Sequence, residues 1–467
     1  MSNNLLKSVA ALTLCASPWL VLTCGTNTRS TLAADSPRAD AKSVATQVTL
    51  YDANPAHLWN RLHSALFIRT TPEGKSFGQD ELDPLLWPES KYLLTGEHHK
   101  HVLSLLDEFL ARDGEQLIRE PLQRAVLQRD LWAVFDWLAN PHAVYGYRSD
   151  DVTPEQRALQ VRLAKIIRRL ALSAEQIRKL PDNYADAITA KAFSSSHDPD
   201  RPESAFLPPD LFQPDGPWVV LGEHMRSAAP VHIRFVQGRS AVFVFMNLPA
   251  GRQATLDYLE RLGAFPNPLM PQPADRNSRF TARNLPRFNP ELPQFPIGTQ
   301  VALVREMLVI DNQGKITPTR LIESVQFRVY REIPEGDPAH PNGFDDIGSK
   351  QDFYEFRFTR KDLFSGKAGG LHAVGPREKE ISLFIPGRED PFDSPDSRPE
   401  GSPIMQSCSG CHGRGPGIHS VEAYRHGFIR LPVPPHLREY HRRQQEEAAM
   451  LYKWENYSWG LLQGLME

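Results

Sequence analysis

The sequence predicts an α+β protein with an N-terminal all-helical region, a central, mainly antiparallel β region and a small C-terminal helical segment. Apolar residues recur at helical spacing over residues 48–190, whereas short runs of β-branched and aromatic residues dominate residues 217–386. A segment rich in proline and acidic residues, 387–403, separates the β region from residues 404–467 and is interpreted as a linker. At roughly 100–200 residues per domain, the chain length allows two to four domains.

The charge balance and the proline content exclude some classes of protein. The chain has 53 Lys and Arg against 56 Asp and Glu. The resulting formal charge of −3 argues against a nucleic-acid-binding protein, because phosphate binding needs a basic surface. Proline accounts for 40 of the 467 residues, which argues against a long coiled coil or a helical solenoid.

The first 34 residues are similar to an export signal. Lys7 supplies a positive charge, and Val9–Cys24 is a mostly apolar stretch, interrupted by Pro18, that is too short to span a bilayer. Thr31-Leu32-Ala33 offers an ordinary signal-peptidase site. One alternative is a lipid anchor at Cys24, because Val21-Leu22-Thr23-Cys24 loosely resembles a lipoprotein box. The other is an uncleaved N-terminal anchor. We expect an exported protein of the periplasm or cell envelope, with no transmembrane segment in the mature chain.

Capping patterns and helical spacing predict five helices in the first region. Asn54 can cap a helix with Pro55 at its first position. Thr153-Pro154-Glu155-Gln156 is a capping box, and Ser173–Gln176 repeats it. The region from Pro181 to Pro217 is interpreted as a crossing loop. The predicted helices run from Pro55 to Phe67, from about Lys100 to Ala111, from Pro121 to about Leu138, from Pro154 to about Leu170, and onward from Ser173.

The second region is predicted to form short antiparallel strands. Arg252–Leu262 has apolar residues at helical spacing and is predicted as a helix among them. The turn Asp311-Asn312-Gln313-Gly314 joins the two longest strands. Alternation over Gln326–Tyr330 predicts that one face of the sheet is exposed to water. The predicted strands are Trp218–Leu221, Val231–Val236, Ala241–Met246, Gln300–Ile310, Lys315–Arg331, Asp352–Phe358 and Glu380–Ile385.

The pentapeptide Cys408-Ser409-Gly410-Cys411-His412 carries the chemistry that the sequence predicts. Once the export signal is discounted, Cys408 and Cys411 are the only certain cysteines, and one pair is not a disulfide scaffold for a protein of this size. The pentapeptide resembles the attachment motif of c-type cytochromes, Cys-x-x-Cys-His. That resemblance implies one covalently attached haem c per chain, bonded to Cys408 and Cys411, with His412 as an axial iron ligand.

The resemblance covers only residues 400–467, and the first 385 residues carry no motif of a recognised family. It implies an electron carrier whose partner is a redox protein or a small-molecule electron donor or acceptor. A distal Met suits electron transfer, whereas an open position suits a haem enzyme or sensor for a peroxide, a gas or a small molecule. The candidates for the distal position are Met450, Met466, His419, His426, His436, His441 or no ligand.

Two other interpretations of the cysteine pair remain. A local disulfide or a thioredoxin-like redox pair would leave an exported binding protein without haem, although the pair follows a linker and no βαβ pattern surrounds it. A zinc site would need distant histidines, because there is no second cysteine pair.

His98 and His101 also have a spacing that can hold a metal, but no third ligand is evident, so an exposed helix start is expected.

A helix predicted from Pro435 to about Glu455 contains Met450. Its arginines are interpreted either as a docking patch for an acidic redox partner or as a solvated face paired with Glu439, Glu446 and Glu447. The aromatic residues at its end either shield a haem edge or fill the core. The residues in question are Arg438, Arg442 and Arg443 for the patch, and Trp454, Tyr457 and Trp459 for the aromatic group.

Overall fold

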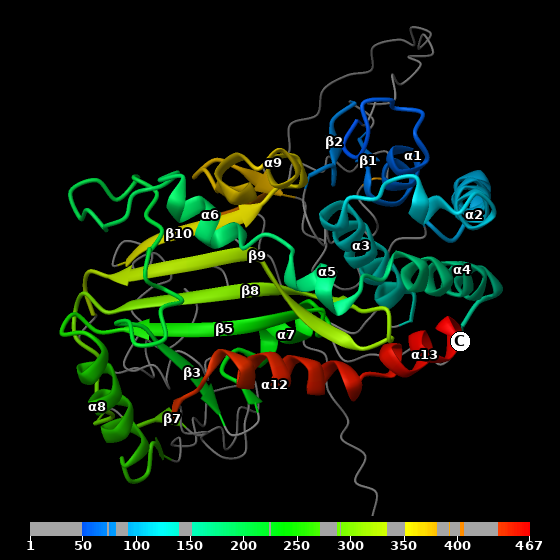
Figure 1. The fold of residues 1–467 in the computed structure, drawn as a ribbon. Helices are drawn as coiled ribbons and strands as arrows, with labels where there is room; N and C mark the ends of the chain where they lie inside the picture. Colours follow the sequence, from blue (N-terminus) through cyan, green and yellow to red (C-terminus); the bar gives the residue numbers. More distant parts are fainter. Residues whose placement is uncertain are drawn as a thin grey trace, which may run out of the picture. The chain divides into compact units, whose positions relative to one another are not determined.

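The fold is α+β, as predicted, with helices before an antiparallel sheet and two helices after it (Figure 1). This computed structural model describes residues 49–71, 74–80, 92–139, 152–223, 226–270, 287–289, 291–333, 351–380, 392, 402–405 and 438–467. All of them lie within one unit, Ala45–Glu467.

The N-terminal part of the unit is helical. Its helices are α1 (Leu58–Phe67), α2 (Gly96–Ala111), α3 (Pro121–Ala139), α4 (Pro154–Leu170), α5 (Ala174–Arg178) and α6 (Asn183–Thr189). A hairpin of β1 (Arg69–Thr70) and β2 (Ser76–Phe77) follows α1, and α4 packs against both α2 and α3. The capping boxes predicted at Thr153 and Ser173 are both formed.

Three details of the helical prediction are wrong. The first helix begins at Leu58 and not at Pro55, because Asn54 Oδ1 accepts a hydrogen bond from Ala56 N and closes a turn before the helix. Helix α2 begins at Gly96, earlier than predicted. The predicted crossing loop contains α6, which is capped by Asp182.

Eight of the described strands form one antiparallel sheet in the order β11-β10-β9-β8-β5-β3-β14, with β4 also paired to β3. Its strands are β3 (Val219–Glu223), β4 (Arg226–Ser227), β5 (Ser240–Asn247), β8 (Gln300–Ile310), β9 (Ile316–Tyr330), β10 (Gln351–Phe358), β11 (Leu371–Ala373) and β14 (Arg438–Glu439). Two short pairs complete the strands: β6 (Leu269–Met270) with β7 (Arg287–Phe288), and β12 (Lys379–Glu380) with β13 (Ser402–Pro403).

Two predictions in the β region are also wrong. Of the run Val231–Val236, predicted as a strand, all but Val236 lies in helix α7 (Pro230–Phe235), because Pro230 starts the helix with a fixed helical φ. The sheet has no fully wet face at Gln326–Tyr330, since the neighbours Phe327 and Arg328 point to opposite faces and are both buried. Of the strand predicted at Glu380–Ile385, residues 381–385 lie outside the described residues.

The other elements of this region surround the sheet. The predicted helix at Arg252 is confirmed as α8 (Arg252–Gly263), and α9 (Arg360–Ser365) follows β10. A small hydrophobic cluster under α8, with Tyr258, Leu259 and Val219, covers part of one face.

Two helices end the chain. They are α12 (Arg442–Trp454) and α13 (Tyr457–Met466). α12 begins later than predicted, because Arg438 and Glu439 form β14. α12 lies along β5, whereas α13 packs against α3 and α4 (Figure 1).

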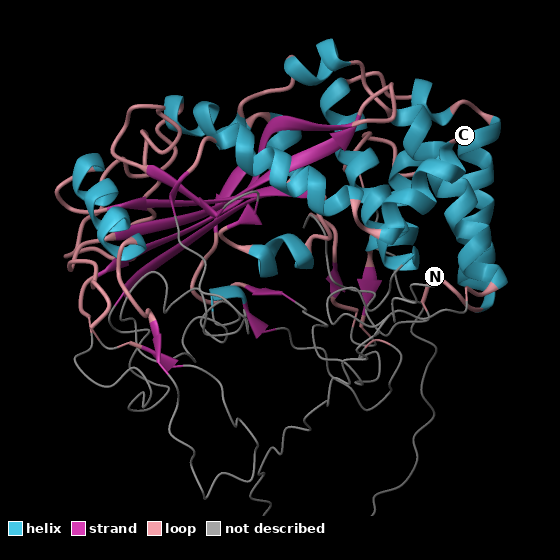
Figure 2. Ribbon diagram, turned by 90° about the horizontal axis from the view of Figure 1, so that it is seen from below, coloured by secondary structure: helices cyan, strands magenta, loops and turns pink. Residues whose placement is uncertain are grey.

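One hydrophobic core joins the helical segments, the sheet and the C-terminal helices. It includes Trp59 of α1, Phe135 of α3, Phe327 of β9 and Trp459 of α13. Figure 2 shows one group of helices beside one end of the strands and other helices across the sheet and at its far end. Across the described ranges, every helix is too short or too polar to serve as a membrane span.

Candidate functional site

The predicted haem-attachment residues, Cys408, Cys411 and His412, lie outside the described residues. The structure places the chain on either side of them. Before the motif, β13 pairs with β12, and Ile404 N donates a hydrogen bond to Glu378 O at 2.9 Å. After the motif, β14 pairs with β3 at the edge of the sheet. Both flanks are therefore held by strand pairing.

Three of the candidates for the distal position lie in the described residues. Met450 and Met466 are partly buried and pack against the hydrophobic core. His441 precedes α12, where its backbone N–H donates to Gln444 Oε1 at 2.9 Å and its side chain is exposed. His419, His426 and His436 lie outside the described residues. Both methionines therefore contact the hydrophobic core, whereas the His441 side chain is exposed to solvent.

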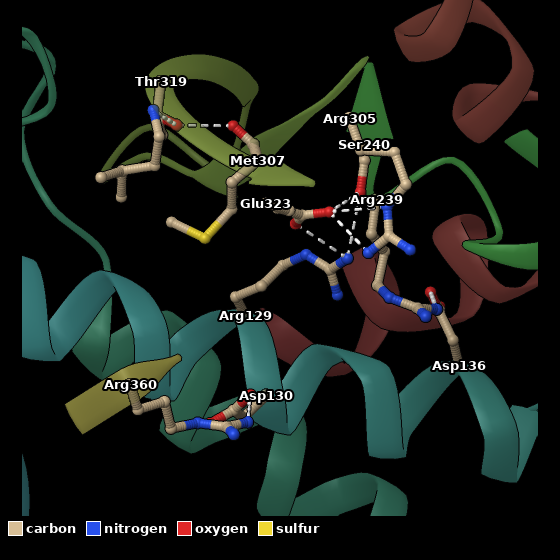
Figure 3. Close-up of polar contacts among 11 residues, drawn as sticks. Arg129, Asp130, Asp136, Arg239, Ser240, Arg305, Met307, Thr319, Glu323 and Arg360 are labelled. Carbon is tan, nitrogen blue, oxygen red and sulfur yellow. Dashed lines mark hydrogen bonds and ion pairs between the residues drawn. The ribbon is translucent and has the colours of Figure 1, made fainter. Parts of the chain in front are cut away.

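A cluster of buried charged side chains joins α3 to the sheet (Figure 3). Arg129 of α3 and Glu323 of β9 have no exposed side-chain surface, and Arg129 Nη2 lies 3.2 Å from Glu323 Oε1. Arg305 Nη2 lies 2.9 Å from the other oxygen of Glu323, to which Ser240 Oγ donates at 2.6 Å. The Glu323 carboxylate therefore connects three segments that are far apart in the sequence.

A second set of buried charges joins α3 to α12 and α13. Asp136 Oδ2 accepts from Arg239 Nη1 at 2.7 Å and from Lys453 Nζ at 2.5 Å. Lys453 also donates to Ser458 Oγ of α13 at 3.1 Å. Burial lowers the pKa of Lys453 to about 8, although the carboxylate of Asp136 opposes the shift.

A third buried pair lies one residue along α3 from Arg129. Asp130 accepts two hydrogen bonds from Arg360 of α9, from Nε at 3.1 Å and from Nη2 at 2.5 Å. The hydroxyl of Tyr51 donates to Asp130 Oδ2 at 3.3 Å. Burial, followed by the charge of Asp130, raises the pKa of Tyr51 well above its usual value. The pair fixes α9 against α3.

A fourth pair lies between the sheet and the start of α12. Glu306 is fully buried at an irregularity of β8, and Arg442 Nε donates to its Oε2 at 3.0 Å. The Arg442 guanidinium lies 4.8 Å from the centre of the Phe212 ring. Burial raises the pKa of Glu306 to about 8, with Arg442 opposing the shift, and burial also raises the pKa of Glu446 beside Arg442.

These charges have a structural role that follows from their burial. Removing one partner of a buried ion pair leaves an uncompensated charge, which costs several kcal/mol, about 3–5. They therefore specify how α12 and α13 dock against α3 and the sheet. The sequence did not lead us to predict these buried ion pairs. One signal for them was present, because Arg129, Asp130 and Asp136 lie within a helix whose other residues are mostly apolar. Such a helix is buried on all sides.

The arginines of the C-terminal helix do not form one patch. Arg442 turns to the buried Glu306, whereas Arg443 is exposed and pairs with Glu447 one turn away at 3.0 Å. Of the aromatic residues, Trp459 is 3% exposed and fills the core, and Trp454 is 52% exposed. The solvated-face interpretation thus applies to Arg443, and the core-filling interpretation applies to Trp459.

The histidines at the start of α2 hold backbone carbonyls. His98 Nε2 lies 2.9 Å from Ala65 O, and the ring stacks on Tyr92. His99 is buried, with Nδ1 2.8 Å from Leu93 O, so this helix start is not wholly exposed. In the described ranges, no three His, Cys, Asp or Glu side chains are placed to hold a metal ion.

One face of the sheet is polar at its centre, and we refer to it as the arginine face. It consists of Val301, Leu303 and Arg305 on β8, Ser324, Gln326 and Arg328 on β9, and Phe353, Glu355 and Arg357 on β10. Arg357 Nε pairs with Glu355 Oε1 at 2.5 Å. The Arg328 guanidinium lies 4.9 Å from the centre of the Phe353 ring. His232 of α7 lies near this face: its burial, followed by the charges of Arg305 and Arg328, lowers its pKa to about 4.

No protein-family model, no curated protein and no solved structure matches the chain significantly.

Proposed function

We propose that this chain is an exported monohaem c-type cytochrome-like protein that binds its haem through Cys408 and Cys411, with His412 as the proximal iron ligand, and that carries electrons. The pentapeptide Cys408–His412 carries the proposal. Two thiols at this spacing suit the two vinyl groups on one haem edge, and the adjacent imidazole can turn beneath the iron. The predicted export signal supports it, because such attachment takes place outside the bacterial cytoplasm.

The described chain on both sides of the motif is compatible with haem attachment. The flanks of the motif are held by strand pairs, so the chain returns to the folded unit on both sides of it. Bound haem supplies one-electron chemistry at iron. The protein's part is to hold and orient the ring and to limit its contact with water.

A second candidate function is a haem enzyme or sensor with an open distal position. The packing of Met450 and Met466 against the core supports it, because neither side chain is then available as the distal ligand. Without a methionine ligand the reduction potential is lower, and an open position admits a peroxide, a gas or a small molecule.

The first experiment asks whether haem is attached at all. The full chain is produced with the cytochrome maturation machinery, purified, and assayed as its pyridine haemochrome. We expect a c-type spectrum that corresponds to one haem per chain, and none for the C408A/C411A control. Absence of the c-type spectrum in the wild-type protein, together with loss of both free thiols, would favour a local disulfide and overturn the proposal.

The second experiment separates the carrier from the enzyme or sensor. The ferrous spectrum is recorded before and after the addition of carbon monoxide. A low-spin spectrum that carbon monoxide leaves unchanged supports the electron carrier, because both axial positions are then filled. A shift of the Soret band on adding carbon monoxide supports the open position and contradicts the carrier.

A further inference from the structure

The segment ahead of the cysteine motif, 387–403, contacts the folded unit at two places among the described residues. Near its end, Ser402 and Pro403 form β13 and pair with β12. Earlier in the segment, Phe392 is partly buried and packs against the hydrophobic core. Phe392 precedes Cys408 by 16 residues. Its contacts therefore bear on how freely the chain moves ahead of the motif.

The β1–β2 hairpin presents a buried face to Phe392. The register pairs Arg69 with Phe77 and Thr70 with Ser76, so the two pairs lie on opposite faces of the hairpin. Arg69 is 3% exposed and Phe77 is 6% exposed. Thr70 is exposed, with its Oγ1 2.9 Å from Ser76 Oγ. One face of the hairpin is thus covered by other parts of the protein, and the other face is in water.

Tyr92 places a second aromatic ring beside the buried face. Its hydroxyl oxygen lies 3.2 Å from Ala65 O and 3.2 Å from Ile68 O, both at the end of α1. The His98 ring stacks on the Tyr92 ring, with ring centres 4.0 Å apart. The Arg69 guanidinium lies 4.1 Å from the centre of the Tyr92 ring. These contacts hold Tyr92 in place without any contribution from residues 387–403.

Phe392 joins this group from a distant part of the chain. The Arg69 guanidinium lies 4.5 Å from the centre of the Phe392 ring. Phe77 meets the same ring edge-on, with centres 6.1 Å apart and an angle of 75° between the planes. We refer to Arg69, Phe77 and Tyr92 as the aromatic socket. An aromatic ring suits the socket, because a guanidinium withdrawn from water gains more from an aromatic face than an exposed guanidinium does.

The charge of the segment is complementary to the socket. Residues 387–403 contain five acidic residues and two arginines. The socket contains the positive Arg69, and Lys75 Nζ lies 4.6 Å from the centre of the Phe77 ring. Opposite charges on two surfaces favour their encounter and suppress wrong pairings. An acidic segment with one aromatic residue therefore matches a socket with aromatic walls and positive charge.

We propose that the aromatic socket is a docking site for Phe392, and that this contact anchors the segment ahead of the cysteine motif to the N-terminal helical region, in place of the free linker that composition predicts. The site recognises an aromatic side chain through the guanidinium of Arg69. Every contact in the socket is made by described side chains, so the anchor does not depend on haem at Cys408.

The test is the rate at which trypsin cleaves the full chain after Arg388, four residues before Phe392, with fragments identified by mass spectrometry. A protease cleaves a segment that leaves the protein surface, so loss of the anchor should raise this rate. We expect F392A to be cleaved roughly tenfold faster than the wild-type protein, and F392Y to keep the wild-type rate. T70A is the matched control on the exposed face of the hairpin and should also keep it.

The same digest reports a general loss of structure through cleavage after Lys379 of β12. If F392A is cleaved after Arg388 at the wild-type rate, Phe392 is not an anchor. Equal gains after Arg388 and Lys379 would mean that Phe392 stabilises the whole fold, which contradicts a local anchor. The digest needs no haem, so its outcome is separate from that of the haemochrome assay.

Two further variants test recognition by the guanidinium. F392L keeps an apolar side chain without an aromatic face, and R69M removes the positive charge, so both should be cleaved after Arg388 faster than the wild-type protein. Wild-type rates in both would show that apolar burial alone holds position 392, and recognition through Arg69 would be wrong. Circular dichroism confirms the folding of each variant. Should R69M be unfolded, F392L and F392Y carry the comparison.

Discussion

Lys453 of α12 and Asp136 of α3 form an ion pair in the interior of the protein, with 2.5 Å between Nζ and Oδ2 and no exposed surface on either side chain. The two residues are separated by more than 300 positions in the chain. Arg239 also binds Asp136 Oδ2, so the carboxylate has two cationic partners. This contact holds α12, which follows the cysteine motif in the sequence, against α3 of the N-terminal helical region.

We predict that K453M lowers the free energy of unfolding by about 3 kcal/mol, as measured by urea denaturation, because it removes one partner of a buried charge. Arg239 still neutralises Asp136 in this variant, which keeps the loss at the lower end of the range for broken buried pairs. The control is K179M, whose Lys179 pairs with Glu175 on an exposed surface and should cost no more than about 0.5 kcal/mol. Equal effects of the two substitutions would contradict the prediction.

The buried Glu306 gives a predicted pH dependence. Its pKa is raised from 4.5 to about 8 by burial, so between these values the folded protein keeps a proton that the unfolded chain releases. The stability that this group contributes is complete below about pH 4.5 and is lost as the pH rises through 8. The slope is at most about 1.4 kcal/mol per pH unit.

E306Q removes this titration. The effect is measured by comparing the unfolding free energies of the wild-type protein and E306Q from pH 5 to 8. The stability of the wild-type protein should fall relative to that of E306Q as the pH rises over this interval. E447Q serves as the control, because Glu447 is an exposed partner of Arg443 and its variant should follow the wild-type curve. A constant difference between the wild-type protein and E306Q over the interval would show that Glu306 does not titrate there.

Local signals predicted local structure well. The capping boxes at Thr153 and Ser173 give the starts of α4 and α5, because a cap depends only on residues within one turn. Helix α7 was missed for a related reason: Val231 and Ile233 favour a strand by residue type, but Pro230 and the hydrogen bonds of one short turn outweigh that preference.

Burial was less predictable than secondary structure. Alternation along Gln326–Tyr330 correctly assigned Phe327 and Arg328 to opposite faces, but it predicted that one face is wet. Whether a strand face is covered depends on which distant elements pack there, and the strand's own pattern does not contain that information. The pairing of Asp136 with Lys453 is unpredictable for the same reason, since no spacing rule links residues so far apart.

Trp459 and Trp454 form a natural pair for testing how the C-terminal helices are anchored. Trp459 is buried, with its ring centre 5.9 Å from that of Trp132 on α3, whereas half of Trp454 is exposed. We predict that W459A lowers the free energy of unfolding by about 3–5 kcal/mol, because it leaves a cavity in the core. W454A should change it by about 0.5 kcal/mol or less. Urea denaturation followed by circular dichroism measures both, and an unchanged free energy of unfolding in W459A would argue against the packing of α13.

The position of Met450 and Met466 predicts the behaviour of the distal haem site. Both side chains pack against the core, so we expect M450L and M466L to leave the ferrous spectrum and the reduction potential of the haem-loaded protein unchanged. Leucine has nearly the same volume as methionine, and the loss of stability should stay below about 1.5 kcal/mol.

H441A is the contrasting variant, because His441 is the exposed described candidate for the same position. If His441 is the distal ligand, H441A converts the ferrous spectrum to one that responds to carbon monoxide, whereas both leucine variants do not. A carbon monoxide response that appears in M450L or M466L, with haem attachment intact, would mean that the methionine leaves the core to bind iron. That outcome would contradict the packing of the C-terminal helices described above, since the same side chain cannot fill the core and the axial position at once.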